Sequence, residues 1–256
     1  MSEQVFAGGL IRSPEDSQDH VLSLDYFGLP SVPLPIYFSW ADKPNHPHVR
    51  DQGTRGTCAG FAGATVKSFQ DRIETGLTWQ LSPEWVYGFA KQCDGLPTGV
   101  EGTYPRAIFK VMQSFGCCQE IYWPYNQVWP FPLPGAFLDA RNHRVGSYGV
   151  IDHTDHDLVK QILIQKGPLL SGVGVTSNWL RDIENIWLIG LTGAGGEEGG
   201  HAITVVGWCP DGFIIQNSWG DAWGRFGYAC LTWRWWDTHV WELWKSVDKK
   251  TKGRPA

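Results

Sequence analysis

Cys58 stands where a glycine-rich loop meets a predicted helix, a placement that suits a nucleophile. The loop contains Gly53 and Gly56, and apolar side chains recur at helical spacing after the cysteine, at Ala62, Val66, Phe69 and Ile73. The unpaired amides and the dipole at a helix N-terminus favour a thiolate, which is the reactive form of cysteine. Because a lone cysteine is also a common buried apolar residue, a base elsewhere in the chain must decide between the two roles.

His201 and Asn217 are the candidates for that base and its partner. His201 begins the apolar run "HAITVVGWC" and Asn217 ends the next run, "GFIIQN", so two consecutive strands joined by a turn would bring them side by side. His201 would take the proton of Cys58 and later give it to a leaving amine, while the Asn217 amide oxygen fixes the imidazole tautomer. Gln52 would donate to an oxyanion together with the Cys58 backbone N–H, and Trp219 would cover the His201–Asn217 hydrogen bond.

The motifs around these residues resemble those of the papain-like cysteine peptidases. "DQGTRGTC" resembles the start of that family's catalytic helix, "GGHA" its histidine strand, and "NSWGDAWGRFGY" its asparagine signature, which is the most specific match. The resemblance covers roughly residues 33–235. The chain departs from the family near the nucleophile, where Ala59 replaces the usual tryptophan and Arg55 replaces a cysteine that usually forms a disulfide.

The resemblance also implies a groove that binds an extended substrate. The sequence "GTYP" is similar to the glycine wall of that groove, and further contacts are expected on both sides of the histidine and after the asparagine. The substrate-binding residues implied in this way are Gly102, Thr103, Tyr104, Pro105, Gly200, Ala202 and Trp219. Because Gly199 and Gly200 precede the histidine, the side-chain preference of the groove stays open.

Local signals divide the chain into a helical half and a sheet half. Ser82 followed by Pro83 predicts a helix that ends near residue 93, and further helices are expected over 104–116 and from about 155 to 167, the last with acidic caps rather than metal ligands. Strands are predicted over 34–40, 168–176, 185–192, 201–209, 212–220 and 227–233.

The expected fold class is therefore α+β, and with the resemblance it is a papain-like fold of two lobes with the active site in the cleft between them. The helical lobe is expected over about 41–130, and the lobe formed by an antiparallel sheet or barrel over about 140–245. Both belong to a peptidase domain at 33–256, and residues 1–32 are expected to form an N-terminal extension.

Composition restricts the partners and the compartment. The 256 residues are 42% hydrophobic and carry a net charge of −5, with no basic run for nucleic acid and no apolar run long enough to span a membrane. The N-terminal sequence lacks the features of a signal peptide and the six cysteines are few, so a cytoplasmic, reducing location is expected. We expect no cofactor and no metal, favour a monomer, and assign most of the 15 tryptophans to the core.

The function predicted from these features is hydrolysis of peptide or amide bonds in a peptide or protein substrate through an acyl-enzyme on Cys58. A thiol acyltransferase or deamidase with the same triad, a non-catalytic papain-fold binding module and a tryptophan-rich carbohydrate binder are the alternatives. The glycine-rich run over 193–200 contains Glu197 and Glu198 and is expected either to line the groove and favour basic substrates or to form a solvated hairpin tip.

Overall fold

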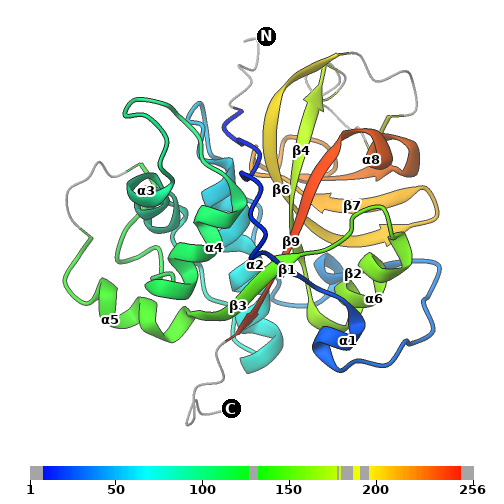
Figure 1. The fold of residues 1–256 in the computed structure, drawn as a ribbon, viewed down its shortest axis with the longest axis horizontal. Helices are drawn as coiled ribbons and strands as arrows, with labels where there is room; N and C mark the ends of the chain where they lie inside the picture. Colours follow the sequence, from blue (N-terminus) through cyan, green and yellow to red (C-terminus); the bar gives the residue numbers. More distant parts are fainter. Residues whose placement is uncertain (1–7, 127–131, 178, 180–186, 191–195, 249–256) are drawn as a thin grey trace.

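The computed structural model describes residues 8–126, 132–177, 179, 187–190 and 196–248. Figure 1 shows the helices at 58–75, 83–93, 105–114 and 136–140 on one side of the molecule, and on the other a strongly curved sheet with the remaining helices beside it. The described N-terminal residues run between these two lobes. The two-lobed α+β architecture expected from the sequence is thus observed.

The longest helix, α2 (Cys58–Thr75), is the centre of the helical lobe. The side chain of Ser82 accepts a hydrogen bond from the Trp85 amide at the start of α3, and Asp155 caps α6 in the same way, so both predicted caps are confirmed. The other α-helices are short or flank α2, and they are α1 (Leu24–Phe27), α3 (Pro83–Cys93), α4 (Pro105–Ser114), α5 (Ala136–Ala140), α6 (His156–Lys166) and α8 (Trp233–His239).

Within the described residues, nine strands form one sheet in the order β1-β3-β9-β4-β6-β7-β8-β5, with β2 also paired to β6. The pairs are antiparallel except for the short contacts β1–β3 and β5–β8. The strands are β1 (His20–Val21), β2 (Phe38–Ser39), β3 (Val145–Val150), β4 (Leu169–Thr176), β5 (Leu188–Ile189), β6 (Glu197–Cys209), β7 (Gly212–Gln216), β8 (Tyr228–Thr232) and β9 (Val240–Asp248).

Several predicted boundaries differ from the structure. The strand expected over 34–40 is reduced to β2, because Ser39 caps a 3-10 helix at Trp40–Asp42. Of the strand expected over 185–192, residues 187–190 are described, and within them β5 covers only Leu188–Ile189. The acidic residues 197–198 belong to β6 and not to a hairpin tip, while residues 193–195 lie outside the described residues.

The core follows the two lobes. One buried cluster joins α2, α3 and α4 around Trp85, and a second fills the interior of the sheet around Trp179, Trp235 and Trp236. Nine of the tryptophans are buried, which confirms that most of them serve the core. Among the described residues, no helix combines the length and apolar character needed to cross a membrane.

The residues before position 33 pack against the body of the protein. His20 and Val21 form β1 beside β3, and the Leu22 amide donates to the Val150 carbonyl at 2.8 Å. Leu22 is fully buried in the sheet lobe, and Leu10 is buried with the helical-lobe cluster.

Candidate active site

Helix α2 holds Cys58 at its first turn. Cys58 is the first residue of the helix, as predicted, and it is completely buried. The preceding residue, Thr57, shares a 2.7 Å hydrogen bond between its hydroxyl and that of Tyr125. Further along α2, a fully buried ion pair joins Lys67 and Asp71 at 2.6 Å, so the buried face of this helix carries charged as well as apolar side chains.

His201 and Asn217 are brought together as the sequence predicted. His201 lies on β6, and Asn217 directly follows β7, its antiparallel neighbour. The His201 Nε2 and Asn217 Oδ1 atoms are 2.7 Å apart in a buried hydrogen bond. An amide oxygen can only accept, so Nε2 carries the proton and Nδ1 carries the lone pair of the neutral imidazole. That tautomer presents a base at Nδ1.

The N-terminus of α2 meets the strand that holds the histidine. The backbone of Ala202, the residue after His201, hydrogen-bonds to the Cys58 thiol. Burial raises the pKa of Cys58 to about 12, although hydrogen bonds from Ala202, Ala59, Cys58 itself and Gly9 lower it. The sequence predicted a thiolate here, but in this structure burial outweighs the helix terminus and favours the neutral thiol.

Aromatic rings enclose His201. The Trp219 ring lies 4.6 Å from the imidazole between centroids, and the Trp179 ring lies 6.2 Å away in an edge-on arrangement. Burial lowers the pKa of His201 to about 4, and the hydrogen bond to Asn217 raises it only in part. Trp219 therefore occupies the covering position predicted for it, and the imidazole is neutral at pH 7.

Gln52 is a buried connector in this structure. Its Oε1 accepts a hydrogen bond from the Ser218 hydroxyl at 2.6 Å, and its Nε2 donates to the Arg55 carbonyl at 2.9 Å. The Ser218 amide in turn donates to Asn217 Oδ1 at 2.8 Å. Gln52 and His201 are thus joined through two consecutive residues, a connection that no local motif in the sequence indicates.

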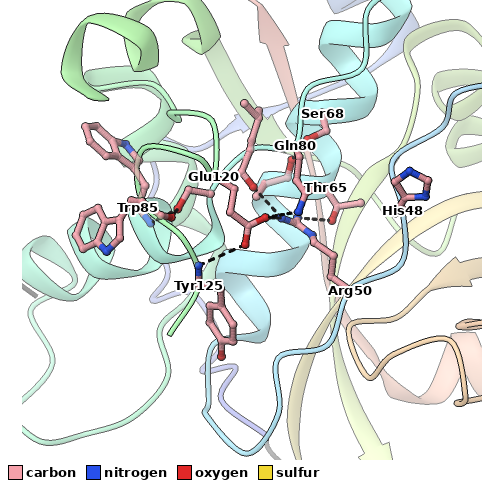
Figure 2. Close-up of polar contacts among 12 residues, drawn as sticks. His48, Arg50, Thr65, Ser68, Gln80, Trp85, Glu120 and Tyr125 are labelled. Atoms are coloured by element: carbon pink, nitrogen blue, oxygen red, sulfur yellow. Dashed lines mark hydrogen bonds and ion pairs between the residues drawn. The ribbon is translucent and has the colours of Figure 1, made fainter. Parts of the chain in front are cut away.

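A second network holds the loop that carries Gln52, and sequence reasoning missed it. Arg50 donates to the Leu81 carbonyl at 2.7 Å and to Thr65 on α2 at 3.2 Å, and it forms an ion pair with Glu120 at 3.4 Å (Figure 2). Glu120 accepts from the backbone amide of Tyr125 (Figure 2), whose hydroxyl donates to the Gln52 carbonyl at 2.6 Å. Because Arg50 and Glu120 are 70 residues apart, only the fold shows that they cooperate.

The predicted substrate-binding residues surround the described N-terminus. Residues 8–13, which we call the N-terminal arm, pass between Thr103 and Gly200. The Thr103 amide donates to the Gly9 carbonyl at 3.0 Å, and the Thr103 carbonyl accepts from the Ile11 amide at 3.0 Å. Gly102 has a φ of 89° and lies against the Gly9 carbonyl.

The remaining residues of the predicted groove have structural contacts of their own. Tyr104 donates its hydroxyl to the Asp94 carbonyl at 2.7 Å, and Pro105 begins α4. Glu197 accepts from His239 Nδ1 at 3.0 Å and from the Trp241 indole at 3.4 Å. Glu197 is therefore held within the sheet lobe by two partners.

The part of the chain that the structure describes contains no candidate metal-binding site. There, no group of three or more His, Cys, Asp or Glu side chains could hold an ion. The six cysteines all lie in the described ranges as free thiols.

Comparisons with known proteins agree with this geometry. The sequence model of the papain family cysteine proteases matches residues 34–235. A cysteine protease of Blomia tropicalis is 29% identical over 209 residues, which span 77% of this chain and 60% of the relative. Papain of Carica papaya is 26% identical over 205 residues, covering 77% of this chain and 54% of the relative. The chain thus matches a little over half the length of these curated relatives.

The fold is shared with solved structures as well. The crystal structure of xylellain, a cysteine protease from Xylella fastidiosa, superimposes with a TM-score of 0.82 at 23% identity, and the alignment covers 98% of this chain and 99% of that one. A Carica candamarcensis cysteine protease, crystallised with E-64, gives a TM-score of 0.69 at 20% identity over 85% of this chain and all of the other. With the family match extending over most of its length, this chain belongs to the papain family of cysteine proteases.

Proposed function

We propose that this protein hydrolyses peptide bonds through a covalent acyl-enzyme on Cys58. The observation that supports this most strongly is the buried 2.7 Å hydrogen bond from His201 Nε2 to Asn217 Oδ1. It presents Nδ1 as the base, while Ala202 brings the same strand against the thiol. A cysteine at a helix start, a base and a third residue that orients the base are the parts that nucleophilic catalysis requires.

The proposed reaction has two stages. His201 accepts the proton of Cys58, and the thiolate sulfur attacks the substrate carbonyl carbon to form a tetrahedral oxyanion. The C–N bond then breaks, the leaving amine takes the proton from His201, and a thioester to Cys58 remains. In the second stage His201 takes a proton from water, the hydroxide attacks the thioester, and the acid product leaves as the thiol is restored.

Gln52 and the Cys58 backbone amide are the proposed oxyanion donors. A carboxamide nitrogen carries two hydrogens, so donation from Gln52 to the Arg55 carbonyl is compatible with donation to an oxyanion. Removing one such donor from an oxyanion site costs about 100- to 1000-fold in kcat. The hydrogen bond from Ser218 fixes the plane of the carboxamide.

We propose a peptide or protein as substrate, bound along Gly102, Thr103, Tyr104 and Pro105 on one side and Gly200, Ala202 and Trp219 on the other. Thr103 and Gly200 support this assignment, because their backbone groups already hold an extended strand of the chain itself. We also propose cleavage within a chain rather than from its ends, and the cytoplasmic location stays a prediction from the sequence.

Product analysis on a peptide library tests the proposal. The native chain and a Cys58→Ala variant should be incubated with the library, with and without an added primary amine, and the products identified by mass spectrometry. New carboxyl termini that depend on Cys58 support peptide hydrolysis. Products that carry the amine at the expense of hydrolysis would instead indicate an acyltransferase, and equal cleavage by Cys58→Ala would refute the role of the thiol.

A further inference from the structure

Arg55 lies in the loop between Gln52 and the nucleophile, and its backbone orients the proposed oxyanion donor. The Arg55 carbonyl accepts a hydrogen bond from Gln52 Nε2 at 2.9 Å and another from the Thr57 amide at 2.8 Å. A movement of residue 55 therefore moves the acceptor that fixes one of the two Nε2 hydrogens of Gln52. The contacts that hold residue 55 in place thus help to set the direction of the carboxamide.

The Arg55 side chain is bound to helix α3 by a bidentate ion pair. Its two terminal nitrogens donate to the two carboxylate oxygens of Glu84, at 2.6 and 2.8 Å, and the Asn126 amide donates to the same carboxylate at 3.3 Å. The Arg55 side chain is 37% exposed and that of Glu84 is 8% exposed, so the carboxylate is largely removed from water. Because a planar guanidinium matches a carboxylate in one relative orientation, this pair restrains orientation as well as distance.

Glu84 is a fixed anchor for this ion pair. It is the second residue of α3 and lies in the first turn, where the free backbone amides of the helix favour a carboxylate. The start of α3 also packs directly on α2, because a Cβ atom at Gly60 would lie 2.7 Å from the Pro83 carbonyl oxygen. Gly60 is on the first turn of α2, which begins at Cys58, so Glu84 belongs to the same packed unit as the nucleophile.

Tyr125 connects the ion pair back to the loop. The Arg55 guanidinium lies 5.1 Å from the centre of the Tyr125 ring, a distance typical of cation–π contacts. The Tyr125 hydroxyl donates to the Gln52 carbonyl at 2.6 Å, so its oxygen accepts from the Thr57 hydroxyl at 2.7 Å. Residues 52, 55 and 57 are thus held by one connected set of contacts, and Arg55 is at its centre.

We propose that Arg55 is a positioning residue for the reaction: its ion pair with Glu84 holds the Gln52 carboxamide where it donates to the oxyanion. This inference rests on the function proposed for Cys58 and Gln52. In this role Arg55 does not bind the substrate, and Glu84 acts only through Arg55. Because an oxyanion donor must stand at a defined place, a small displacement of Gln52 lowers the rate of the chemical step without weakening ground-state binding.

Kinetics of two variants test the proposal. Glu84→Gln retains the shape of the side chain but removes its charge, and Arg55→Ala removes the cation. Each should lower kcat for a peptide substrate by about tenfold or more and change KM by less than about twofold. Unchanged kcat in both folded variants would overturn the proposal. A rise in KM alone would also overturn it, because Arg55 would then be a substrate contact.

Asp237→Asn is the matched control. It removes the charge of a carboxylate that forms an ion pair with His156 at 2.7 Å in the sheet lobe, away from the loop that carries Gln52. This variant should leave kcat unchanged. A fall as large as that in Glu84→Gln would show that any lost ion pair lowers kcat, and it would overturn a specific role for Arg55.

The dependence on Gln52 gives a sharper test. If Arg55 acts through Gln52, adding Glu84→Gln to a Gln52→Ala chain should lower kcat by less than about a further twofold, because the group that the ion pair positions is already absent. A further fall equal to that in the native background would show that the ion pair acts independently of Gln52, and the proposal would be wrong.

A structural readout separates this role from the proposed function. In proton–nitrogen NMR spectra, the side-chain amide hydrogens of Gln52 should exchange with water at least about tenfold faster in Glu84→Gln than in the native chain. Arg55→Ala replaces Glu84→Gln if that variant does not fold. Faster exchange in a protein whose native form cleaves no peptide would retain the positioning role and refute the peptidase. An unchanged exchange rate in the folded variant would overturn the positioning role, whether or not the native chain cleaves peptides.

Discussion

Replacing Gln52 distinguishes an oxyanion donor from a structural brace. In the structure Gln52 is 1% exposed and makes hydrogen bonds to the buried Ser218 hydroxyl and to the Arg55 carbonyl, which also accepts from the Thr57 amide. Gln52→Ala leaves the buried Ser218 hydroxyl without this partner, at a cost of about 1–3 kcal/mol, whereas the Arg55 carbonyl keeps the Thr57 amide as a donor. Ser218→Ala breaks only the first bond and leaves the Gln52 nitrogen in place, so it is the matched control.

The expected effect of Gln52→Ala on kcat is separate from its effect on stability. If Gln52 donates to the oxyanion, its contact strengthens only as the tetrahedral intermediate forms, so Gln52→Ala should lower kcat by about 100- to 1000-fold, or roughly 2.7–4 kcal/mol. KM should change little, because ground-state binding is retained. Ser218→Ala should lower kcat by less than about tenfold, the equivalent of one ordinary hydrogen bond.

The assay measures peptide turnover and Cys58 alkylation on the same folded proteins. Alkylation needs no oxyanion site, so its rate should stay near that of the parent in both Gln52→Ala and Ser218→Ala. If turnover and alkylation fall together in Gln52→Ala, Gln52 is a brace and the oxyanion assignment is wrong.

Four further outcomes are expected. In protein that shows peptide turnover, brief iodoacetamide exposure near pH 6 should label Cys58 far faster than the other five cysteines, and even labelling would refute an activated thiol. The pKa of His201 is lowered to about 4 from an unfolded value near 6.5, so the folded state is fully stable with respect to this group above pH 6.5 and loses up to about 3 kcal/mol as the pH falls through 4. His201→Phe should remove this part of the pH dependence of the unfolding free energy measured in urea, and an unchanged pH profile would contradict it. Asp71→Asn removes one charge of the buried ion pair on α2 and should cost about 3–5 kcal/mol of unfolding free energy, whereas a loss below 1 kcal/mol would show that the pair is dispensable. Glu197→Gln with Glu198→Gln should lower kcat/KM more for basic than for neutral peptides, and equal effects would reject an acidic groove wall.

Signals that act over a few residues were sufficient to predict several helices and the placement of Cys58, His201 and Asn217. The serine cap before Pro83 and the aspartate cap of α6 act over three residues, and the structure contains both. The placement of Cys58 at a helix start and of His201 and Asn217 on neighbouring strands follows from the same short-range patterns. Each of these features is determined by local hydrogen bonding and by apolar periodicity.

Features that depend on distant partners could not be predicted. The bonds from Gln52 to Ser218 and from Arg50 to Glu120 join residues 166 and 70 positions apart. Helix α8 begins within the tryptophan-rich run at 233–236, where aromatic residues favour neither period, so the helix and β9 after it were missed.

The contacts of the N-terminal arm could not be predicted from the sequence for a related reason. It is held mainly through backbone groups and glycine contacts, which produce no hydrophobic periodicity, so residues 8–13 resembled an unstructured extension. Burial explains why the thiolate predicted at Cys58 is not favoured in this structure, because its effect on the pKa outweighs that of the helix terminus.

Direct detection of the acyl-enzyme tests the central claim. The protein should be mixed with a peptide ester, quenched in acid within one turnover, and examined by intact mass and peptide mapping. We predict a transient mass increase equal to the acyl part of the ester, located on Cys58 and absent in Cys58→Ala. Turnover with no adduct on Cys58, or with an adduct on another residue, would contradict the account.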